Sequence, residues 1–270
     1  MHKNTKLSST ITAQIVDLYS TGIGTQQIAS MLSVHPSTVQ KYIKKCGILT
    51  PKQRYTHNAD FFSTYTPESA YWAGFIMADG YVRTNRHMLG IHLNEEDKNH
   101  LHTFLHTINS TNNLVHDVHT NAWCVQLYSK QIKQDLSTQF NIVARKSLIA
   151  TFPSQIPKEY YNHFIRGVMD GDGSITYTTM PTLSFVGART LITPIVNIIS
   201  NAVALTMHKQ KLKPVISTPN KNKNWFTSVA FYGKNANNVL DWLYQESTTN
   251  TRLARKYEKY RELFTAGGAE

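Results

Sequence analysis

The stretches YWAGFIMADG (71–80) and FIRGVMDGDG (164–173) lie 93 residues apart and follow one plan. Each is a largely apolar run that predicts a helix, and each ends in Asp-Gly, where the Gly can end the helix. Small residues recur four positions apart, as Gly74 and Ala78 in the first stretch and Gly167 and Gly171 in the second. Because this spacing lets two helix backbones approach closely, we expect the helices to cross tightly, with their acidic ends side by side.

The segments that follow the two stretches also repeat. Each half predicts two strands, an amphipathic helix, two more strands, a further helix and a basic tag, ARKS (144–147) or ARKY (254–257). The first half has predicted strands at 81–84, 88–94, 114–119 and 123–128, and helices at 97–108 and 130–140. The second has strands at 174–178, 182–186, 214–218 and 225–232, and helices at 190–204 and 235–246. The expected fold is α+β, with two pseudo-symmetric αββαββα halves, 66–150 and 151–270, that form a saddle of antiparallel sheets.

The acidic end of each predicted helix is electrostatically unfavourable. A helix C-terminus carries partial negative charge and favours Lys, Arg or His, yet Asp79 and Asp172 occupy it in the two copies. Bringing the ends together adds repulsion between like charges. A divalent cation removes both conflicts, and oxygen ligands of this kind suit Mg²⁺. The alternative is two exposed aspartates that only cap their helices, and the repetition of the pattern favours the metal site.

WAGFIMADG (72–80) and IRGVMDGDG (165–173) resemble the two motifs of the LAGLIDADG homing endonucleases. The resemblance runs from about residue 60 to residue 262 and includes the joint between the halves (144–175) and the closing tag RLARKYEKY (252–260). It implies the same fold, in a monomer that acts as a pseudo-dimer. It also implies hydrolysis of both strands of a long double-stranded DNA target across the minor groove, leaving short 3′ overhangs, with Mg²⁺ or another divalent cation as cofactor.

The resemblance also assigns metal ligands. The acidic residue before the final Gly of each motif, Asp79 or Asp172, binds the metal in the family. The residue just before it, Ala78 or Gly171, would offer a backbone carbonyl.

By their position in the repeat, Lys146 and Lys256 resemble the family's catalytic-pocket lysines, where a compact positive charge suits a phosphate. Surface lysines that only touch phosphate are the alternative. The chain departs from the family motif at Met77, where the motif letter is Asp, whereas Asp170 holds that position in the second copy. We therefore assign Asp170 no catalytic role and expect a hydrogen bond at the helix end, or packing.

Residues 1–48 predict a separate all-α unit of three short helices, broken around 21–24 and 33–35, with Pro36 at the start of the third. Two short helices joined by a tight turn, the second polar and basic, match the helix-turn-helix pattern. The stretch TQQIASMLSVHPSTVQKYIKK (25–45) resembles the helix-turn-helix of recombinases and transposases. A plain three-helix bundle with a basic face is the alternative. Residues 49–65 predict a linker.

Contacts with DNA are expected from the third of these helices and from the exposed strand faces. Residues facing outward alternate along a strand with residues facing inward, such as Val82 and Ile175. The candidates for DNA contact are Ser37, Thr38, Gln40, Lys41, Lys44, Lys45, Arg83, Asn85, His92, Asn94, Thr176, Thr178, Ser184, Lys211, Lys213, Asn220 and Lys223.

The composition agrees with a nucleic-acid partner. The chain has 270 residues, with 28 Lys and Arg against 17 Asp and Glu, and a net charge of +11 favours a polyanion. No apolar run is long enough for a transmembrane helix, and the N-terminus lacks the pattern of a secretory signal. Only Cys46 and Cys124 are present, which fits the cytoplasm of a bacterial or phage-infected cell, or another reducing compartment that contains DNA.

Two other functions stay open. A non-cleaving DNA-binding transcription regulator would share the core and a helix-turn-helix, although such proteins usually lose the motif acids, which are retained here. An intron RNA maturase would add intron RNA as a partner. A cleavage assay with magnesium tests the first alternative, and a splicing assay tests the second.

Overall fold

The computed structural model describes residues 7–21, 23–48, 55–118, 120–206, 215–217 and 226–266, without the side chains of 204–206, 215–217 and 263–266. The chain forms two compact units, Met1–Thr56 and His57–Glu270. Within the described residues, no helix is both long and apolar enough to cross a membrane.

The smaller unit contains three helices, α1 (Ser9–Ser20), α2 (Thr25–Met31) and α3 (Pro36–Lys45). Each helix contributes apolar residues to one small core that includes Ile15, Ile28 and Ile43. The Ser8 side chain accepts a hydrogen bond from the Ile11 amide at the start of α1, and Pro36 occupies the first turn of α3. These are the local features that favour a helix N-terminus, so the three predicted helices lie where sequence patterning places them.

The first half of the larger unit begins with α5 (Pro67–Ala78) and a four-stranded antiparallel sheet of order β1-β2-β4-β3. Its strands are β1 (Gly80–Val82), β2 (Met88–Asn94), β3 (Val115–Asp117) and β4 (Ala122–Tyr128). The 3-10 turn η1 (Glu95–Asp97) leads into α6 (Lys98–Thr107), and α7 (Lys130–Phe140) follows β4. Both helices pack on this sheet. The turn η2 (Lys146–Leu148) closes the half.

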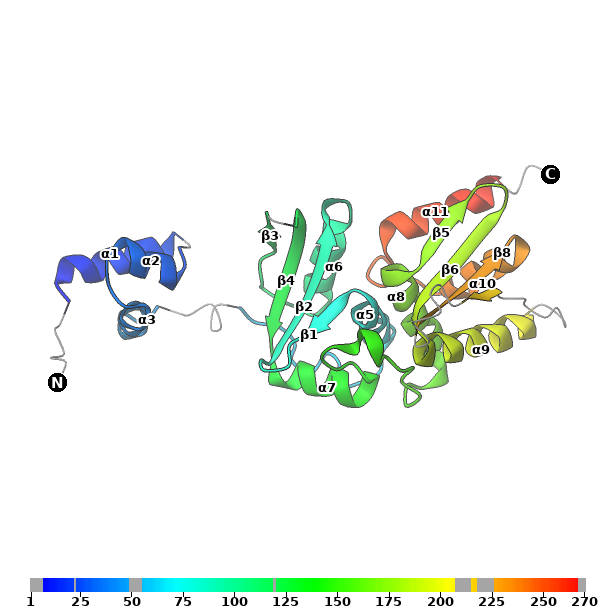
Figure 1. Cartoon of the computed structure of the whole chain (residues 1–270), viewed down its shortest axis with the longest axis horizontal. Helices are drawn as coiled ribbons and strands as arrows, with labels where there is room; N and C mark the ends of the chain where they lie inside the picture. The colour runs from blue at the N-terminus through cyan, green and yellow to red at the C-terminus, as the bar shows by residue number, and fades with distance from the viewer. Residues whose placement is uncertain are drawn as a thin grey trace. The chain divides into compact units, whose positions relative to one another are not determined.

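The second half repeats this order. After the turn η3 (Lys158–Tyr160) come α8 (Tyr161–Asp172), β5 (Ser174–Tyr177), β6 (Pro181–Ala188), α9 (Arg189–Thr206), β7 (Val215–Ser217), β8 (Phe226–Tyr232) and α10 (Lys234–Tyr244). The second antiparallel sheet has the order β5-β6-β8-β7, which matches the first sheet strand for strand. The predicted α+β fold of two αββαββα halves is therefore confirmed, with α5 and α8 between the two sheets (Figure 1).

The contact between α5 and α8 is the most extensive between helices in the described structure. A methyl group on Gly74 would overlap the Phe164 carbonyl oxygen, and one on Gly167 would overlap the Tyr71 carbonyl oxygen. The backbones thus touch, as the small-residue spacing predicts. Around this crossing α5 is buried on all sides from Ser69 to Met77, which explains why its sequence is apolar without a polar stripe.

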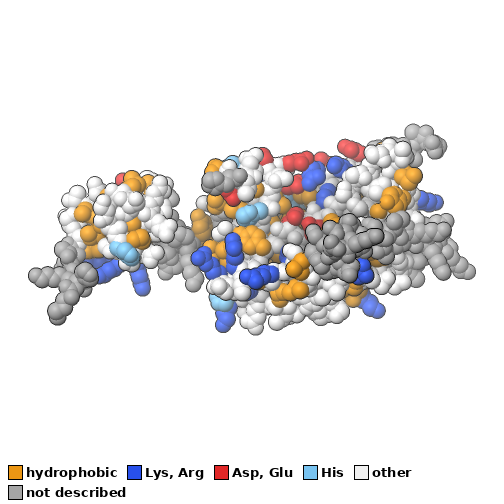
Figure 2. All heavy atoms as spheres, viewed as in Figure 1, with side chains coloured by type: hydrophobic (Ala, Val, Ile, Leu, Met, Phe, Trp, Pro, Cys, Tyr) orange, Lys and Arg blue, Asp and Glu red, His pale blue; other side chains and the backbone are white. Residues whose placement is uncertain are grey.

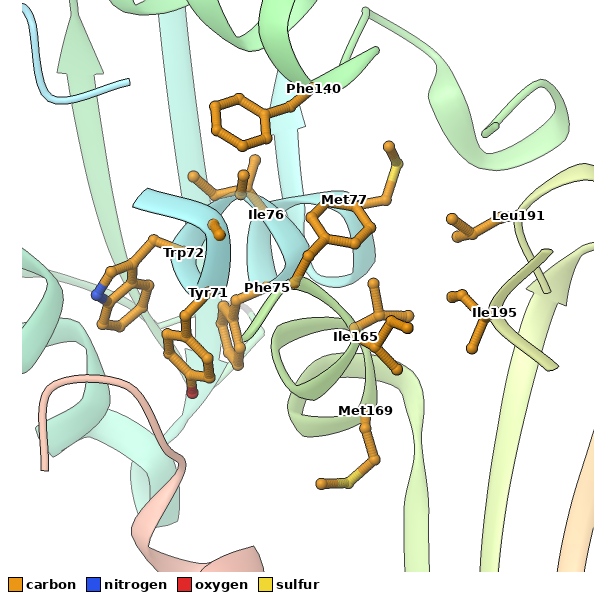
Figure 3. Packing of buried hydrophobic residues seen from close by; sticks show 14 of the residues in the cluster. Tyr71, Trp72, Phe75, Ile76, Met77, Phe140, Ile165, Met169, Leu191 and Ile195 are labelled. Carbon is orange, nitrogen blue, oxygen red and sulfur yellow. The ribbon is translucent and has the colours of Figure 1, made fainter. Parts of the chain in front are cut away.

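Side chains from both halves meet beside the crossing. Figure 3 shows Phe75 and Met77 of α5 near Ile165 of α8, with Ile195 of α9 approaching from the second half. All four are at most 3% exposed. One continuous hydrophobic core therefore spans the two halves, and they form a single unit rather than two independent lobes.

Two details differ from expectation. The glycines after the motif aspartates do not adopt the left-handed conformation of a helix C-cap, because Gly80 enters β1 and Gly173 is extended with φ −82° and ψ 169°. Glycine is required at both positions because a side chain would not fit. A methyl group on Gly80 would overlap Ile76, and one on Gly173 would overlap Met169, in the preceding helical turn.

The second difference is a long terminal helix, α11 (Ala254–Ala266), where the sequence predicts only a basic tag. Its Tyr257 and Tyr260 rings lie 5.2 Å and 4.8 Å from the Tyr244 ring of α10. Residues three apart share one face of a helix, so these rings give α11 an apolar side that packs on α10. The same ARK letters at 144–146 do not form a helix, because Arg145 is left-handed and only the short turn η2 begins at Lys146.

We expect Gly74→Ala to destabilise the larger unit by about 3 kcal/mol or more, because the added methyl meets rigid backbone and the crossing helices must separate. Urea denaturation of the full chain measures this loss. Asn99→Ala is the control, since Asn99 is exposed on α6 of the same unit and a surface change there should cost little. A Gly74→Ala variant as stable as the parent would contradict the close crossing.

Candidate functional site: two aspartates and two lysines at the helix crossing

Asp79 and Asp172 lie at the adjoining C-terminal ends of α5 and α8. Asp79 is the C-cap residue of α5, and Asp172 is the last residue of α8. Gly171 packs against Ala78, and a methyl group on Gly171 would lie 3.5 Å from Asp79 Oδ2. The end of each motif helix thus touches the end of the other, which brings together the two acidic ends that sequence analysis singled out.

Two lysines from the basic tags reach the same place. Lys146 Nζ donates a hydrogen bond to the Ala78 carbonyl at 3.2 Å. Lys256 Nζ donates to carbonyl oxygens at the end of α8, namely those of Met169, Asp170, Gly171 and Gly173, at 2.6 to 3.2 Å. Each ammonium therefore offsets the negative end of one motif helix. We call Asp79, Asp172, Lys146 and Lys256 the carboxylate–lysine cluster.

The pKa values of the cluster shift as burial and close charges require. Burial, followed by repulsion from Asp172, raises the pKa of Asp79 to about 6. Burial also raises the pKa of Asp172, which the two lysines oppose. The pKa of each lysine is lowered by burial and is partly restored by nearby carboxylates. Lys146 and Lys256 are buried, Asp79 is half-buried and Asp172 stays accessible to solvent. Four neighbouring groups whose pKa values are shifted mark a candidate functional site.

The donor set at the cluster fits a divalent cation such as Mg²⁺. No group of three or more His, Cys, Asp or Glu side chains within the described residues could hold a metal. Two carboxylates are nevertheless typical of Mg²⁺ sites, where water and substrate phosphates complete the coordination. The Ala78 and Gly171 carbonyls already accept hydrogen bonds from the lysines, although a carbonyl oxygen has a second lone pair. Their role as metal ligands stays a prediction.

Asp170 does not belong to the cluster. Its carboxylate is 1% exposed and accepts hydrogen bonds from the Tyr71 and Tyr244 hydroxyls and from the Leu253 amide. This arrangement agrees with the expectation of a helix-end hydrogen bond. The corresponding residue of α5, Met77, is an apolar core residue.

The outward face of the first sheet presents several predicted DNA contacts. In β2, Leu89, Ile91 and Leu93 face the core, so His92 and Asn94 lie on the opposite, exposed face. Tyr81 shares that face, and its hydroxyl lies 3.2 Å from His92 Nε2. Val82 is buried as expected. Arg83 and Asn85 lie beyond the end of β1, in the exposed loop that joins β1 to β2.

That loop borders a polar hollow of about 520 Å³. The residues lining it are Arg83, Thr84, Asn85, Arg86, Met88, Gln126, Tyr128 and Arg145. Lys133 of α7 holds the loop by donating hydrogen bonds to the carbonyls of Arg83, Thr84 and Arg86 at 2.8, 3.0 and 3.1 Å. Figure 2 shows Lys and Arg side chains gathered over the first half.

Arg86 and Arg145 line this hollow but are not among the DNA contacts predicted from the sequence. Arg145 adopts a left-handed conformation with φ 60°. Arg255 is instead the second residue of α11 and pairs with Asp97 of the first half at 2.7 Å. The repeat alone gives both arginines the same role. The Arg-rich loop sequence around 83–86 is the signal that could have indicated the hollow.

The predicted DNA contacts on β5 and β6 in the second half are neutral polar residues. Thr176 and Ser184 lie on the face opposite the buried Ile175 and Leu183, and Thr176 is exposed. Thr178 falls just past the end of β5, in the hairpin. Lys211, Lys213, Asn220 and Lys223 lie outside the described residues, as does part of the predicted linker at 49–54.

In the smaller unit, α3 turns Val39 and Ile43 into the core. Ser37, Gln40, Lys41, Lys44 and Lys45 are exposed, and Thr38 is half-buried. The polar residues predicted to contact DNA are therefore accessible. The interpretation of this unit as a helix-turn-helix stays a prediction.

No family model matches the sequence, and no curated protein matches it either. Among solved structures, the chain is similar to the I-LtrWI LAGLIDADG homing endonuclease bound to target DNA, with 11% identity, a TM-score of 0.43, and coverage of 79% of this chain and 92% of that one. It is also similar to I-DmoI in complex with DNA and Ca, with 12% identity, a TM-score of 0.45, and coverage of 76% of this chain and 99% of that one. A third similar structure is the N-terminal LAGLIDADG domain of WhiA, with 10% identity, a TM-score of 0.41, and coverage of 75% of this chain and 93% of that one. Likeness at this level carries no conclusion about activity.

The raised pKa of Asp79 predicts how stability depends on pH. Between the ordinary value of 3.8 and about 6, the folded chain keeps a proton that the unfolded chain has released, so this carboxyl lowers stability as pH rises through that range. In EDTA, Asp79→Asn should therefore raise the free energy of unfolding above pH 7 by on the order of 1 kcal/mol, and by much less near pH 4.

Urea denaturation at the two pH values measures the difference, with the exposed Asp60→Asn as the control. If Asp79→Asn changed stability equally at both pH values, Asp79 would not be a buried carboxyl beside a like charge.

Proposed function

We propose that this protein is a site-specific, Mg²⁺-dependent DNA endonuclease that hydrolyses both strands of a long duplex target and leaves short 3′ overhangs. The observation that carries the proposal is the carboxylate–lysine cluster, where Asp79 and Asp172 meet at the crossing of α5 and α8 with one lysine on each side. The resemblance of both motifs to those of the LAGLIDADG homing endonucleases supports the same reaction.

In this proposal the aspartates and the lysines of the cluster have different roles. Asp79 and Asp172 would hold the divalent cations, which supply Lewis-acid stabilisation of the phosphate and activation of the attacking water when bound. Lys146 and Lys256 would each place a positive charge beside one scissile phosphate and offset the charge that develops there. One lysine on each half suits two strands, because each strand needs its own water in line with the bond that breaks.

The surfaces around the cluster would bind the DNA. On the first sheet, His92 and Asn94 face outward, and the arginines of the hollow can pair with phosphate or with the guanine edge. On the second sheet, Thr176 and Ser184 offer neutral hydrogen-bonding groups. The net charge of +11 favours association with duplex DNA at both units.

The test begins with a randomised duplex library, which is incubated with the full chain and Mg²⁺ before the new DNA ends are sequenced. We expect a recurring cut sequence with staggered 3′ ends, and no cutting in EDTA. Selective binding without any cut would favour the transcription regulator instead. Activity confined to the splicing of intron RNA would favour the maturase.

With the selected site in hand, Asp79→Asn and Asp172→Asn should each abolish cleavage while leaving DNA binding within about threefold, because the change removes a metal ligand at nearly constant shape. Cleavage is followed on gels and binding by fluorescence anisotropy in Ca²⁺. Asp60→Asn is the control and should cut normally. If either motif variant still cut both strands at the parent rate, the site would be wrongly assigned.

For the smaller unit, we expect Lys41→Ala, Lys44→Ala and Lys45→Ala each to weaken DNA binding with little dependence on sequence. A lysine that contacts phosphate releases a counterion on binding, so each change should reduce the slope of log affinity against log salt by about 1. The exposed Lys158, in the turn before α8, is the control. Unchanged slopes for all three variants would show that α3 does not contact the backbone.

A further inference from the structure

Asp170 is a fully buried carboxylate that the proposed reaction does not use. We propose that Asp170 is a positioning residue, which anchors the start of α11 and thereby holds Lys256 against the end of α8. Met77 holds the corresponding position in the first half, so the two halves should cut their strands through unequally positioned lysines. The consequence for cleavage depends on the proposed function, whereas the positioning itself does not.

The contacts of Asp170 join three separate segments. Its Oδ2 accepts hydrogen bonds from the Leu253 amide at 2.7 Å and from the Tyr71 hydroxyl at 2.8 Å, and its Oδ1 accepts one from the Tyr244 hydroxyl at 3.2 Å. Leu253 lies 83 residues away in sequence, and Tyr71 belongs to the other half. A buried carboxylate whose donors come from fixed elements defines one geometry, because any displacement leaves it unpaired.

Leu253 is the link to the cluster. It directly precedes α11, and its carbonyl accepts the Tyr257 amide at 3.0 Å, so Lys256 sits in the first turn that Leu253 begins. The carboxylate also lies where the amides at a helix N-terminus favour negative charge. Fixing Leu253 therefore fixes the direction from which the Lys256 side chain reaches the carbonyls of α8.

A second contact holds the same turn. Arg255 donates to both oxygens of Asp97, from Nε at 3.1 Å and from Nη2 at 2.7 Å. The start of α11 is thus attached to α8 through Asp170 and to the first half through Asp97. Lys256 lies between these two attachments, and an ammonium with three protons is fully used by the four carbonyls that it faces.

The described residues of the first half show neither of these restraints. Met77 replaces the aspartate, and Lys146 follows a residue in the left-handed conformation instead of starting a long helix. Among the residues that the structure describes, Lys146 Nζ makes one hydrogen bond, to the Ala78 carbonyl. Lys256 is therefore held by four hydrogen bonds and two anchored neighbours, whereas Lys146 has one hydrogen bond and the attraction of Asp172 and Asp79.

The test uses Asp170→Asn in the full chain, with Asp241→Asn as the matched control. Asp241 also accepts a tyrosine hydroxyl, that of Tyr260 at 2.9 Å, and this bond also ties α11 to α10, but away from Lys256. Tyr244→Phe is a milder variant that removes one donor from Asp170. Two measurements are made: acetylation of each lysine by mass spectrometry without metal or DNA, and strand-resolved cleavage of the selected duplex.

We expect acetylation of Lys256 to rise several-fold in Asp170→Asn, while Lys146 keeps its parent level. Cleavage of one strand should slow by about tenfold or more, the usual cost of losing a residue that orients a functional group, so that nicked DNA accumulates. Tyr244→Phe should shift both measurements in the same direction by a smaller factor. Asp241→Asn should match the parent.

Unchanged acetylation of Lys256 in Asp170→Asn and Tyr244→Phe would overturn the proposal, as would equal slowing of both strands. If Asp170→Asn did not fold, Tyr244→Phe would decide between these outcomes. If the parent cut no DNA, the proposed nuclease function would fail, and acetylation would still test the positioning of Lys256.

Discussion

The direct contact between the backbones of α5 and α8 is the constraint on which the rest of the structure depends. It requires Gly74 and Gly167, because any side chain there would meet a carbonyl of the opposing helix. The contact places two helix C-termini together, and with them two aspartates. The sheets then extend from the crossing on either side, each beginning directly after its motif helix.

Bringing the two acidic helix ends together is electrostatically unfavourable. One lysine offsets it at each end, Lys146 with one hydrogen bond and Lys256 with four. Two negative helix ends and two carboxylates meet in a partly buried place, which raises the pKa of Asp79 to about 6. Lys146 and Lys256 supply positive charge at the carbonyls. An aspartate at a helix C-terminus is locally unfavourable, and here it occurs twice. Such residues, when groups distant in sequence compensate them, are typical of functional sites. In the described structure the two lysines hydrogen-bond to backbone carbonyls and not to the Asp79 and Asp172 carboxylates.

Much of the fold could be predicted from the sequence because its signals are local and repeated. The periodicity predicts β2 and α7 with the observed bounds, and the small residues predict the crossing. Contacts between residues that are far apart in the sequence could not be predicted from such local patterns. The bond between Asp170 and Leu253 spans 83 residues, and α11 packs on Tyr244 of α10 through two tyrosines that follow its ARK letters. The roles of the site residues stay predictions.

The measurement that tests this account most directly is the pKa of the Asp79 carboxyl, followed by carbon-13 NMR in the parent chain and in Asp172→Asn, without metal. The account predicts a pKa of about 6 in the parent and a lower value in the variant, because one of the two charges is removed. The same pKa in both chains would mean that the two carboxyls do not share a site, and a shared metal centre at the helix crossing would be contradicted.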